Sequence, residues 1–154
     1  MPVVQFNQVS EEEKELLYNA TALVTYLIGG ADNNFDEKER AQSAHLVNIR
    51  TEQGDPMLFD YYLDLQVDFA ERVAKVEAKY GVDSVNDRTA LLVAELEKLN
   101  DILPKLDDIY ARAYLKALRT LAKGVAEASG GLLGFLEISY EEEHLMGLTM
   151  ITFE

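Results

Sequence analysis

The residues of this chain whose types and spacing best suit chemistry are carboxylates that follow a glycine pair. Within residues 29–39, Asp32, Asp36 and Glu39 lead into a polar, helix-like pattern. Carboxylate oxygens are the preferred ligands of hard divalent cations such as Ca²⁺, Mg²⁺ and Mn²⁺. The stretch therefore predicts a loose cation site of oxygen ligands, with Asp32, Asp36 and Glu39 as those ligands.

A second stretch near the far end of the chain repeats this layout. Residues 130–143 also open with a glycine pair and close in a carboxylate-rich helix start, so Glu137, Glu141 and Glu142 form a second candidate cluster. If two such halves pack about a pseudo-twofold axis, their carboxylates meet, and a cation or protons must offset the repulsion. The alternative is that these acids are helix caps and first-turn residues, which the helix dipole favours without any ligand.

Better-defined metal motifs are incomplete. The first stretch matches an EF-hand at its first, third and fifth positions, but Glu37 stands where glycine is needed and Ser43 where a bidentate glutamate is required. Glu141 and His144 have the Glu-x-x-His spacing of di-iron bundles, which need a second such pair and two more glutamates. With no cysteine and two histidines, thiolate chemistry is excluded and acid–base chemistry has few candidates. We expect no enzymatic activity, and a carboxylate-bound metal enzyme is kept only as an alternative.

Basic residues recur along one predicted helix of this acidic chain. They are Lys105, Arg112, Lys116, Arg119 and Lys123. Helical spacing places them along one face of a helix over residues 105–123. Such a face would dock an acidic protein partner. The alternative is a solvated face whose charges pair with neighbouring glutamates.

Composition excludes several classes of partner. The 154 residues include 14 basic and 28 acidic side chains, which gives a formal net charge of −14. Nucleic acid and anionic lipid both attract basic surfaces, so we expect no nucleic acid and no direct membrane insertion. The first ten residues lack a secretory-signal pattern, and the apolar run at 23–28 is too short to span a bilayer. We therefore expect a cytoplasmic protein.

Hydrophobic spacing predicts a single all-α domain over residues 1–154, a bundle of about six helices preceded by an extended N-terminal arm at 1–9. The helices are expected at about 11–28, 36–53, 56–80, 84–100, 101–128 and 139–151. Ser10 and Glu13 form a capping box before the first helix. Asp55 before Pro56, and Asp83 or Ser84, mark later starts.

Pro104 decides where one helix ends and the next begins. Proline inside a helix costs about 3 kcal/mol. We therefore expect a break near Asn100, with Asp101 as the next cap and Pro104 in the first turn, or alternatively a single kinked helix. The helix from Asp101 is predicted to turn Leu106 and Ile109 toward the core.

The two glycine-led stretches together resemble a known family. The run Ala31-Asp32-Asn33-Asn34-Phe35-Asp36-Glu37-Lys38-Glu39 resembles the Ala-Asp-Gly-x-apolar-(Ser/Asp)-x-x-Glu motif of the tellurite-resistance TerB-like family. Asn33 stands where that family commonly has glycine, and Asn tolerates the same left-handed conformation. The second half-motif is similar to Ala128-Ser129-Gly130-Gly131-Leu132-Leu133-Gly134-Phe135 followed by Ile138-Ser139-x-x-Glu142.

The resemblance implies a helical bundle with an internal pseudo-twofold repeat. It also implies a bacterial stress-response role beside other tellurite-resistance-type proteins, some of them in membrane-associated complexes, and an affinity for divalent cations. By motif position, Asp32 and Glu39 carry over from the first half and Glu142 from the second. No enzymatic activity is implied. We expect a protein partner and leave open whether the chain forms a homo-oligomer.

Overall fold

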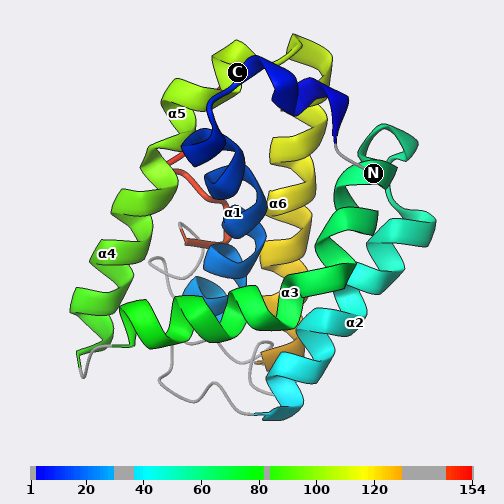
Figure 1. Cartoon of the computed structure of the whole chain (residues 1–154). Coiled ribbons are helices and arrows are strands. Elements are labelled where there is room, and N and C mark those ends of the chain that lie inside the picture. The colour runs from blue at the N-terminus through cyan, green and yellow to red at the C-terminus, as the bar shows by residue number, and fades with distance from the viewer. Residues whose placement is uncertain (1–2, 30–36, 82–83, 130–144, 154) are drawn as a thin grey trace.

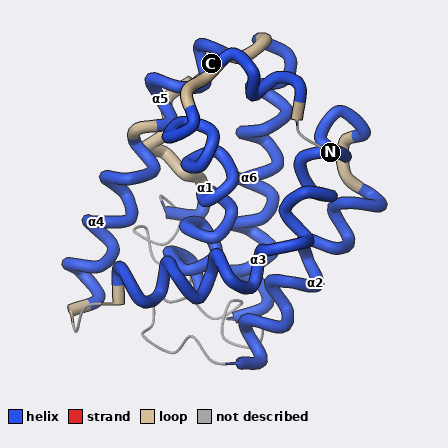
Figure 2. The backbone as a smooth tube through the Cα atoms, in the orientation of Figure 1, coloured by secondary structure: helices blue, strands red, loops and turns tan. Residues whose placement is uncertain are grey.

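The computed structural model describes residues 3–29, 37–81, 84–129 and 145–153, and within these ranges every regular element is helical (Figure 2). The expected all-α class is therefore confirmed for this part of the chain. The α-helices are α1 (Glu11–Gly29), α2 (Glu37–Gln53), α3 (Phe59–Tyr80), α4 (Val85–Glu97), α5 (Leu99–Ile102) and α6 (Asp108–Ser129). The 3₁₀ helices are η1 (Val4–Gln8), η2 (Pro56–Leu58) and η3 (Leu103–Lys105).

The predicted sixth helix falls largely outside these ranges. In its described part residues 145 and 146 are helical and residues 147–150 form turns, so the helix ends before the predicted residue 151. These turns are closed by backbone bonds of 3.0 Å from Leu148 to Leu145 and from Ile151 to Leu148. Five of the described α-helices are thus long, and α5 has only four residues.

α1 is the central helix of the bundle (Figure 1). From Ala20 to its end every residue is buried, and a helix that is buried on all sides must be enclosed by neighbours. α3, α4, α5 and α6 contact α1, whereas α2 packs on α3 and α6. The predicted capping box at the start of α1 is confirmed. The amide of Ser10 donates a 2.9 Å bond to the Glu13 carboxylate, and the amide of Glu13 donates a 3.1 Å bond to the Ser10 hydroxyl.

α3 bends at Asp68, where the backbone leaves helical geometry (φ −133°, ψ 16°). Its first half runs beside α2, and its second half crosses α1 toward α4 (Figure 1). Arg72 links this bend, which we call the elbow of α3, to α1 by hydrogen bonds. Its guanidinium lies 3.0 Å from Asp68, 2.7 Å from Glu15 and 2.7 Å from Asn19.

The boundary before α6 differs from the sequence-based prediction. α5 ends at Ile102, Pro104 lies in η3, and α6 begins only at Asp108. Asp107 marks this start, since its carboxylate accepts a 3.4 Å bond from the amide of Tyr110. The predicted cap at Asp101 is therefore wrong. α6 begins after η3 has changed the direction of the chain, so the residues of α6 that face the core are not those of a helix continued from Asp101. Ile109 is therefore 64% exposed and does not face the core.

The N-terminal arm is not extended as predicted but folds as η1. Phe6 is 1% exposed and its ring meets those of Tyr18, Tyr61 and Tyr110 edge-on at 5.3, 6.0 and 6.2 Å. Val4, by contrast, is 74% exposed. One aromatic side chain therefore fastens the arm over α1, α3 and α6.

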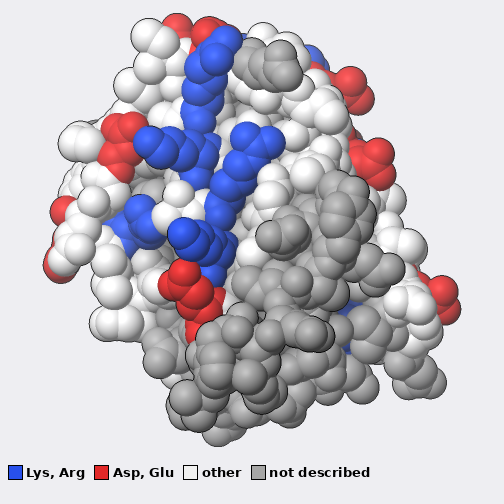
Figure 3. Space-filling model, turned by 180° about the vertical axis from the view of Figure 1, so that it is seen from behind, with Lys and Arg blue, Asp and Glu red and all other residues white. Residues whose placement is uncertain are grey.

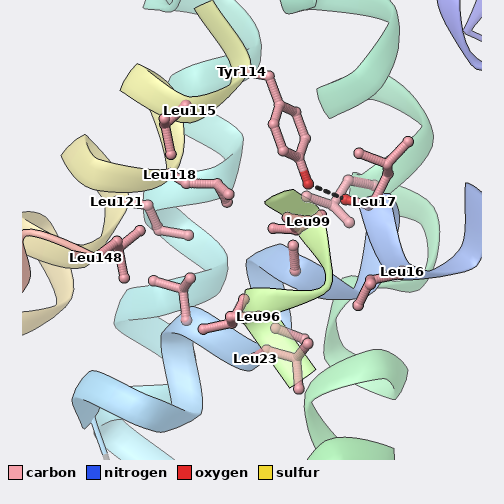
Figure 4. Close-up of a cluster of buried hydrophobic side chains, with 14 of the residues drawn as sticks. Leu16, Leu17, Leu23, Leu96, Leu99, Tyr114, Leu115, Leu118, Leu121 and Leu148 are labelled. Atoms are coloured by element: carbon pink, nitrogen blue, oxygen red, sulfur yellow. Dashed lines mark hydrogen bonds between the residues drawn. The ribbon is translucent and has the colours of Figure 1, made fainter. Parts of the chain in front are cut away.

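Hydrogen bonds from buried tyrosines connect the helices of the core. The hydroxyls of Tyr61 and Tyr114 donate bonds of 2.7 and 2.6 Å to the carbonyl oxygen of Leu17 in α1. Figure 4 shows Tyr114 reaching Leu17 through a cluster of leucine side chains. Because a buried hydroxyl without a partner is costly, these bonds let α3 and α6 place large polar rings against α1. Tyr110 differs, since its buried hydroxyl has no hydrogen-bond partner among the residues described.

Candidate functional site

The predicted cation ligands cannot be assembled into a site from the described ranges. Five of them lie outside those ranges, namely Asp32, Asp36, Glu137, Glu141 and Glu142. The backbone of Glu39 is part of α2, but its side chain is also outside what is described. Among the residues that are described, no group of three or more acidic or histidine side chains is placed to hold a metal ion. The cation site stays a prediction.

The structure brings four of the five predicted basic residues together on α6. Arg112, Lys116, Arg119 and Lys123 are all exposed, and Figure 3 shows a column of basic side chains along this side of the molecule. We call these four residues the basic face of α6. They fall at helical spacing on one side of the helix, as the sequence predicts.

Lys105 is not part of the basic face. It lies in η3, before α6 begins, and its ammonium is 2.6 Å from a carboxylate oxygen of Glu13 at the start of α1. The hydrogen bond from Lys105 lowers the pKa of the Glu13 carboxyl. The expectation of one continuous helix from 105 to 123 is therefore wrong at its first residue, because η3 and Asp107 interrupt it.

An open hollow of about 710 Å³ lies along the basic face. Besides the four basic residues, it is lined by Leu115, Thr120 and Phe153. Leu115 is 2% exposed and belongs to the core, whereas Phe153 comes from the far end of the chain. The hollow therefore combines a cationic rim with the apolar ring of Phe153, which suits a ligand that carries both carboxylates and an apolar group.

The four cations differ in how far they are already paired. Arg112 forms a 2.8 Å ion pair with Asp108 one turn earlier. Arg119 donates to the carbonyl oxygens of Gly147 and Ile151. Lys116 and Lys123 have no carboxylate within ion-pair distance in the described part of the chain. These two ammonium groups are the ones most available to an incoming anion.

Residues 145–153, which we call the C-terminal segment, contribute Phe153 to the lining of the hollow. The side chain of Asn100 accepts a 2.7 Å bond from the amide of Thr152 and donates a 2.9 Å bond to the carbonyl of Met150. Within the segment, the side chains of Leu148 and Ile151 are buried in the core, at 0% and 1% exposure. The amide group of Asn100 therefore satisfies one backbone acceptor and one backbone donor of the segment. Sequence patterns give no signal for this contact, because it joins residues far apart in the chain.

Comparison with known proteins does not assign the chain to a family. No family model matches it, and neither does any curated protein or solved structure. The likeness to the TerB-like family therefore rests on the two glycine-led stretches, most of whose residues lie outside the described ranges. Within those ranges, none of the helices has the length and apolar character needed to cross a bilayer.

Proposed function

We propose that this protein is a non-enzymatic binding module that docks an acidic segment of a protein partner in the hollow along α6. The observation that carries the proposal is the gathering of Arg112, Lys116, Arg119 and Lys123 around an open hollow, in a chain whose formal net charge is −14. Opposite charges across an interface steer association and fix orientation. A basic face on an acidic protein is therefore a selective place for such a contact.

The acidic remainder of the surface narrows the kind of anion that fits. A long polyanion such as nucleic acid would be repelled by the 28 acidic residues once it extended beyond the basic face. A short acidic peptide presents its charge locally and avoids this repulsion. Phe153 adds an apolar contact, so a segment with carboxylates around one apolar side chain is favoured.

The test is a titration with a short labelled peptide rich in glutamate that carries one phenylalanine. A double variant with Lys116→Glu and Lys123→Glu should bind at least about tenfold more weakly, since each reversal near a bound carboxylate is worth about 1 kcal/mol. The matched control is Lys75→Glu with Lys98→Glu. Lys75 on α3 and Lys98 between α4 and α5 have side chains that are 75% and 63% exposed.

The control changes net charge by the same amount as the test pair. If the control weakens binding equally, the attraction is non-specific and the proposed site is wrong. Absence of saturable binding by the unaltered protein also contradicts the proposal. We expect the affinity for the peptide to fall markedly as salt is added, because interactions between exposed charges are screened at physiological ionic strength.

We also propose, from the sequence resemblance, a TerB-like stress-response role with a divalent cation held by the two acidic stretches and an internal pseudo-twofold repeat. Two observations support this proposal. The described ranges are all helical, and both glycine-led stretches occur in the same sequence. Ca²⁺, Mg²⁺ or Mn²⁺ should then raise the melting temperature of chelator-treated protein in a saturable way. Asp32→Ala should remove that effect without loss of helicity, and an unchanged response would discard the site.

A further inference from the structure

α3 carries apolar side chains on the side that faces away from the core. Phe59, Leu63 and Val67 are 46%, 38% and 87% exposed, and their four-residue spacing aligns them on one surface stripe. Tyr61 and Leu65 on the opposite side are buried. The first half of α3 is therefore apolar on two sides, and the fold of this chain uses only one of them.

The stability of the chain does not explain this stripe. Valine is a poorer helix former than alanine or lysine, and at 87% exposure Val67 gains little from packing. Single exposed apolar residues, such as Leu91 on α4, are ordinary on protein surfaces. Aligned ones form a continuous patch, and such patches are typical of interaction sites.

Aspartates run along one edge of the stripe. Asp60, Asp64 and Asp68 each follow one of its apolar residues by one position, so their spacing is the same. Tyr18 donates a 2.7 Å bond to Asp64, and Arg72 lies 3.0 Å from Asp68. These bonds fix two of the carboxylates in place, and the ion pair with Arg72 offsets part of the charge at Asp68. The edge thus presents ordered negative charge beside an apolar surface.

We propose that this side of α3 docks an amphipathic helix of a protein partner, with apolar residues against the stripe and Lys or Arg against the aspartates. From Phe59 to Val67 the stripe is roughly 12 Å long at 1.5 Å per residue, which matches about two turns of a partner helix. It ends at the elbow at Asp68, where α3 changes direction.

Charge distinguishes this occupant from a second copy of the chain. A copy would bring the same row of aspartates and the same formal net charge of −14, so like charges would meet. A basic helix instead gains from both the apolar stripe and its acidic edge. The surface is on a different helix from the hollow along α6 and takes a ligand of opposite charge.

The probe is a synthetic helical peptide with leucines at every fourth position and lysines on one flank. A peptide of the same composition with its leucines scattered serves as the comparison. We expect the unaltered protein to bind the ordered peptide at least about tenfold more tightly than the scattered one in calorimetric titration. Equal affinities would overturn the proposal.

The decisive variant is Leu63→Glu with Val67→Glu. Both side chains are exposed, so the fold should survive, and circular dichroism would verify this. The added glutamates make the surface more acidic, so a purely electrostatic contact would tighten. We expect instead that the preference for the ordered peptide is lost. Retained or tighter binding would overturn the proposal.

The matched control is Leu91→Glu with Ile109→Glu, which replaces two apolar residues that are 47% and 64% exposed on other helices. It should keep the preference for the ordered peptide, and an equal loss in the control would contradict the assignment. Sedimentation of the unaltered protein tests the other occupant. A dimer that Leu63→Glu with Val67→Glu dissolves would show that a second copy covers the stripe, and would overturn the proposal.

Discussion

The guanidinium of Arg119 donates a 3.0 Å hydrogen bond to the carbonyl oxygen of Gly147, and a second bond of 3.2 Å to that of Ile151. One side chain thus lines the hollow along α6 and also holds the C-terminal segment, which contributes Phe153 to the same hollow. Arginine suits this double use because its planar fork carries five donors, whereas lysine has a single charged point. The shape of the proposed docking site therefore depends on a residue that also supplies its charge.

Loss of this guanidinium should loosen the C-terminal segment. Arg119→Ala is expected to lower the free energy of unfolding by about 1–2 kcal/mol, since two hydrogen bonds from a charged donor are lost. Hydrogen exchange should accelerate at the amides of Leu148 and Ile151 in particular. Arg112→Ala is the matched control, because its exposed pair with Asp108 is worth less than about 0.5 kcal/mol. Equal exchange in both variants would contradict the assigned role of Arg119.

Asn100 should anchor the same segment independently. Asn100→Ala removes the bonds to the backbone of Met150 and Thr152 and leaves those groups to find water. We expect a loss of about 1–3 kcal/mol in denaturant unfolding. Asn48→Ala, at an exposed position of α2, should instead be neutral or slightly stabilising because alanine is the better helix former. If Asn100→Ala were also neutral, the segment would not depend on this contact.

Two buried tyrosines should respond in opposite ways to loss of the hydroxyl. Tyr114→Phe removes the donor to Leu17 and is expected to cost about 1 kcal/mol of unfolding free energy. Tyr110→Phe removes a buried hydroxyl that has no partner among the described residues, so it should be neutral or stabilising. Chemical denaturation of the two variants checks this. A larger loss for Tyr110→Phe would mean that its hydroxyl has a partner.

Local signals in the sequence predicted the helix starts well. The capping box at Ser10, and the caps at Asp55 and Ser84, all form the predicted bonds, because each depends on residues within three positions. Asp55, however, caps η2 and not α3 itself. The start of α6 was missed, because Asp101 and Asp107 are equally good caps in isolation and the choice between them depends on how η3 packs.

The candidate site was predictable only in part. Helical spacing correctly grouped Arg112, Lys116, Arg119 and Lys123, since their separations are set by α6 alone. Spacing cannot show that Lys105 pairs with Glu13, because that contact depends on where α1 and η3 lie in the fold. The roles of Asn100 and Arg119 on the C-terminal segment depend on backbone groups that carry no residue-type signal.

High pH is predicted to destabilise the protein through its buried tyrosines. Burial raises the pKa of Tyr62 to about 12 and also raises the pKa of Tyr61 and of Tyr114 above its ordinary value. In the unfolded chain these phenols ionise near pH ~10, so above that pH the unfolded state has lost protons that the folded state keeps. Stability is therefore unaffected below about pH 10. It should fall between about pH 10 and 12, by about 1.4 kcal/mol per pH unit for each such tyrosine.

Urea unfolding at a series of alkaline pH values measures this slope. Tyr62→Phe removes one titrating group, so the slope should decrease by about 1.4 kcal/mol per pH unit, while stability near neutral pH should change little. The tyrosinate absorbance of the buried rings should appear together with the loss of the helical circular dichroism signal. If that absorbance developed fully while helicity was retained, the rings would be reached by solvent in the folded state. That result would contradict the buried hydrogen bonds from Tyr61 and Tyr114 to the carbonyl oxygen of Leu17.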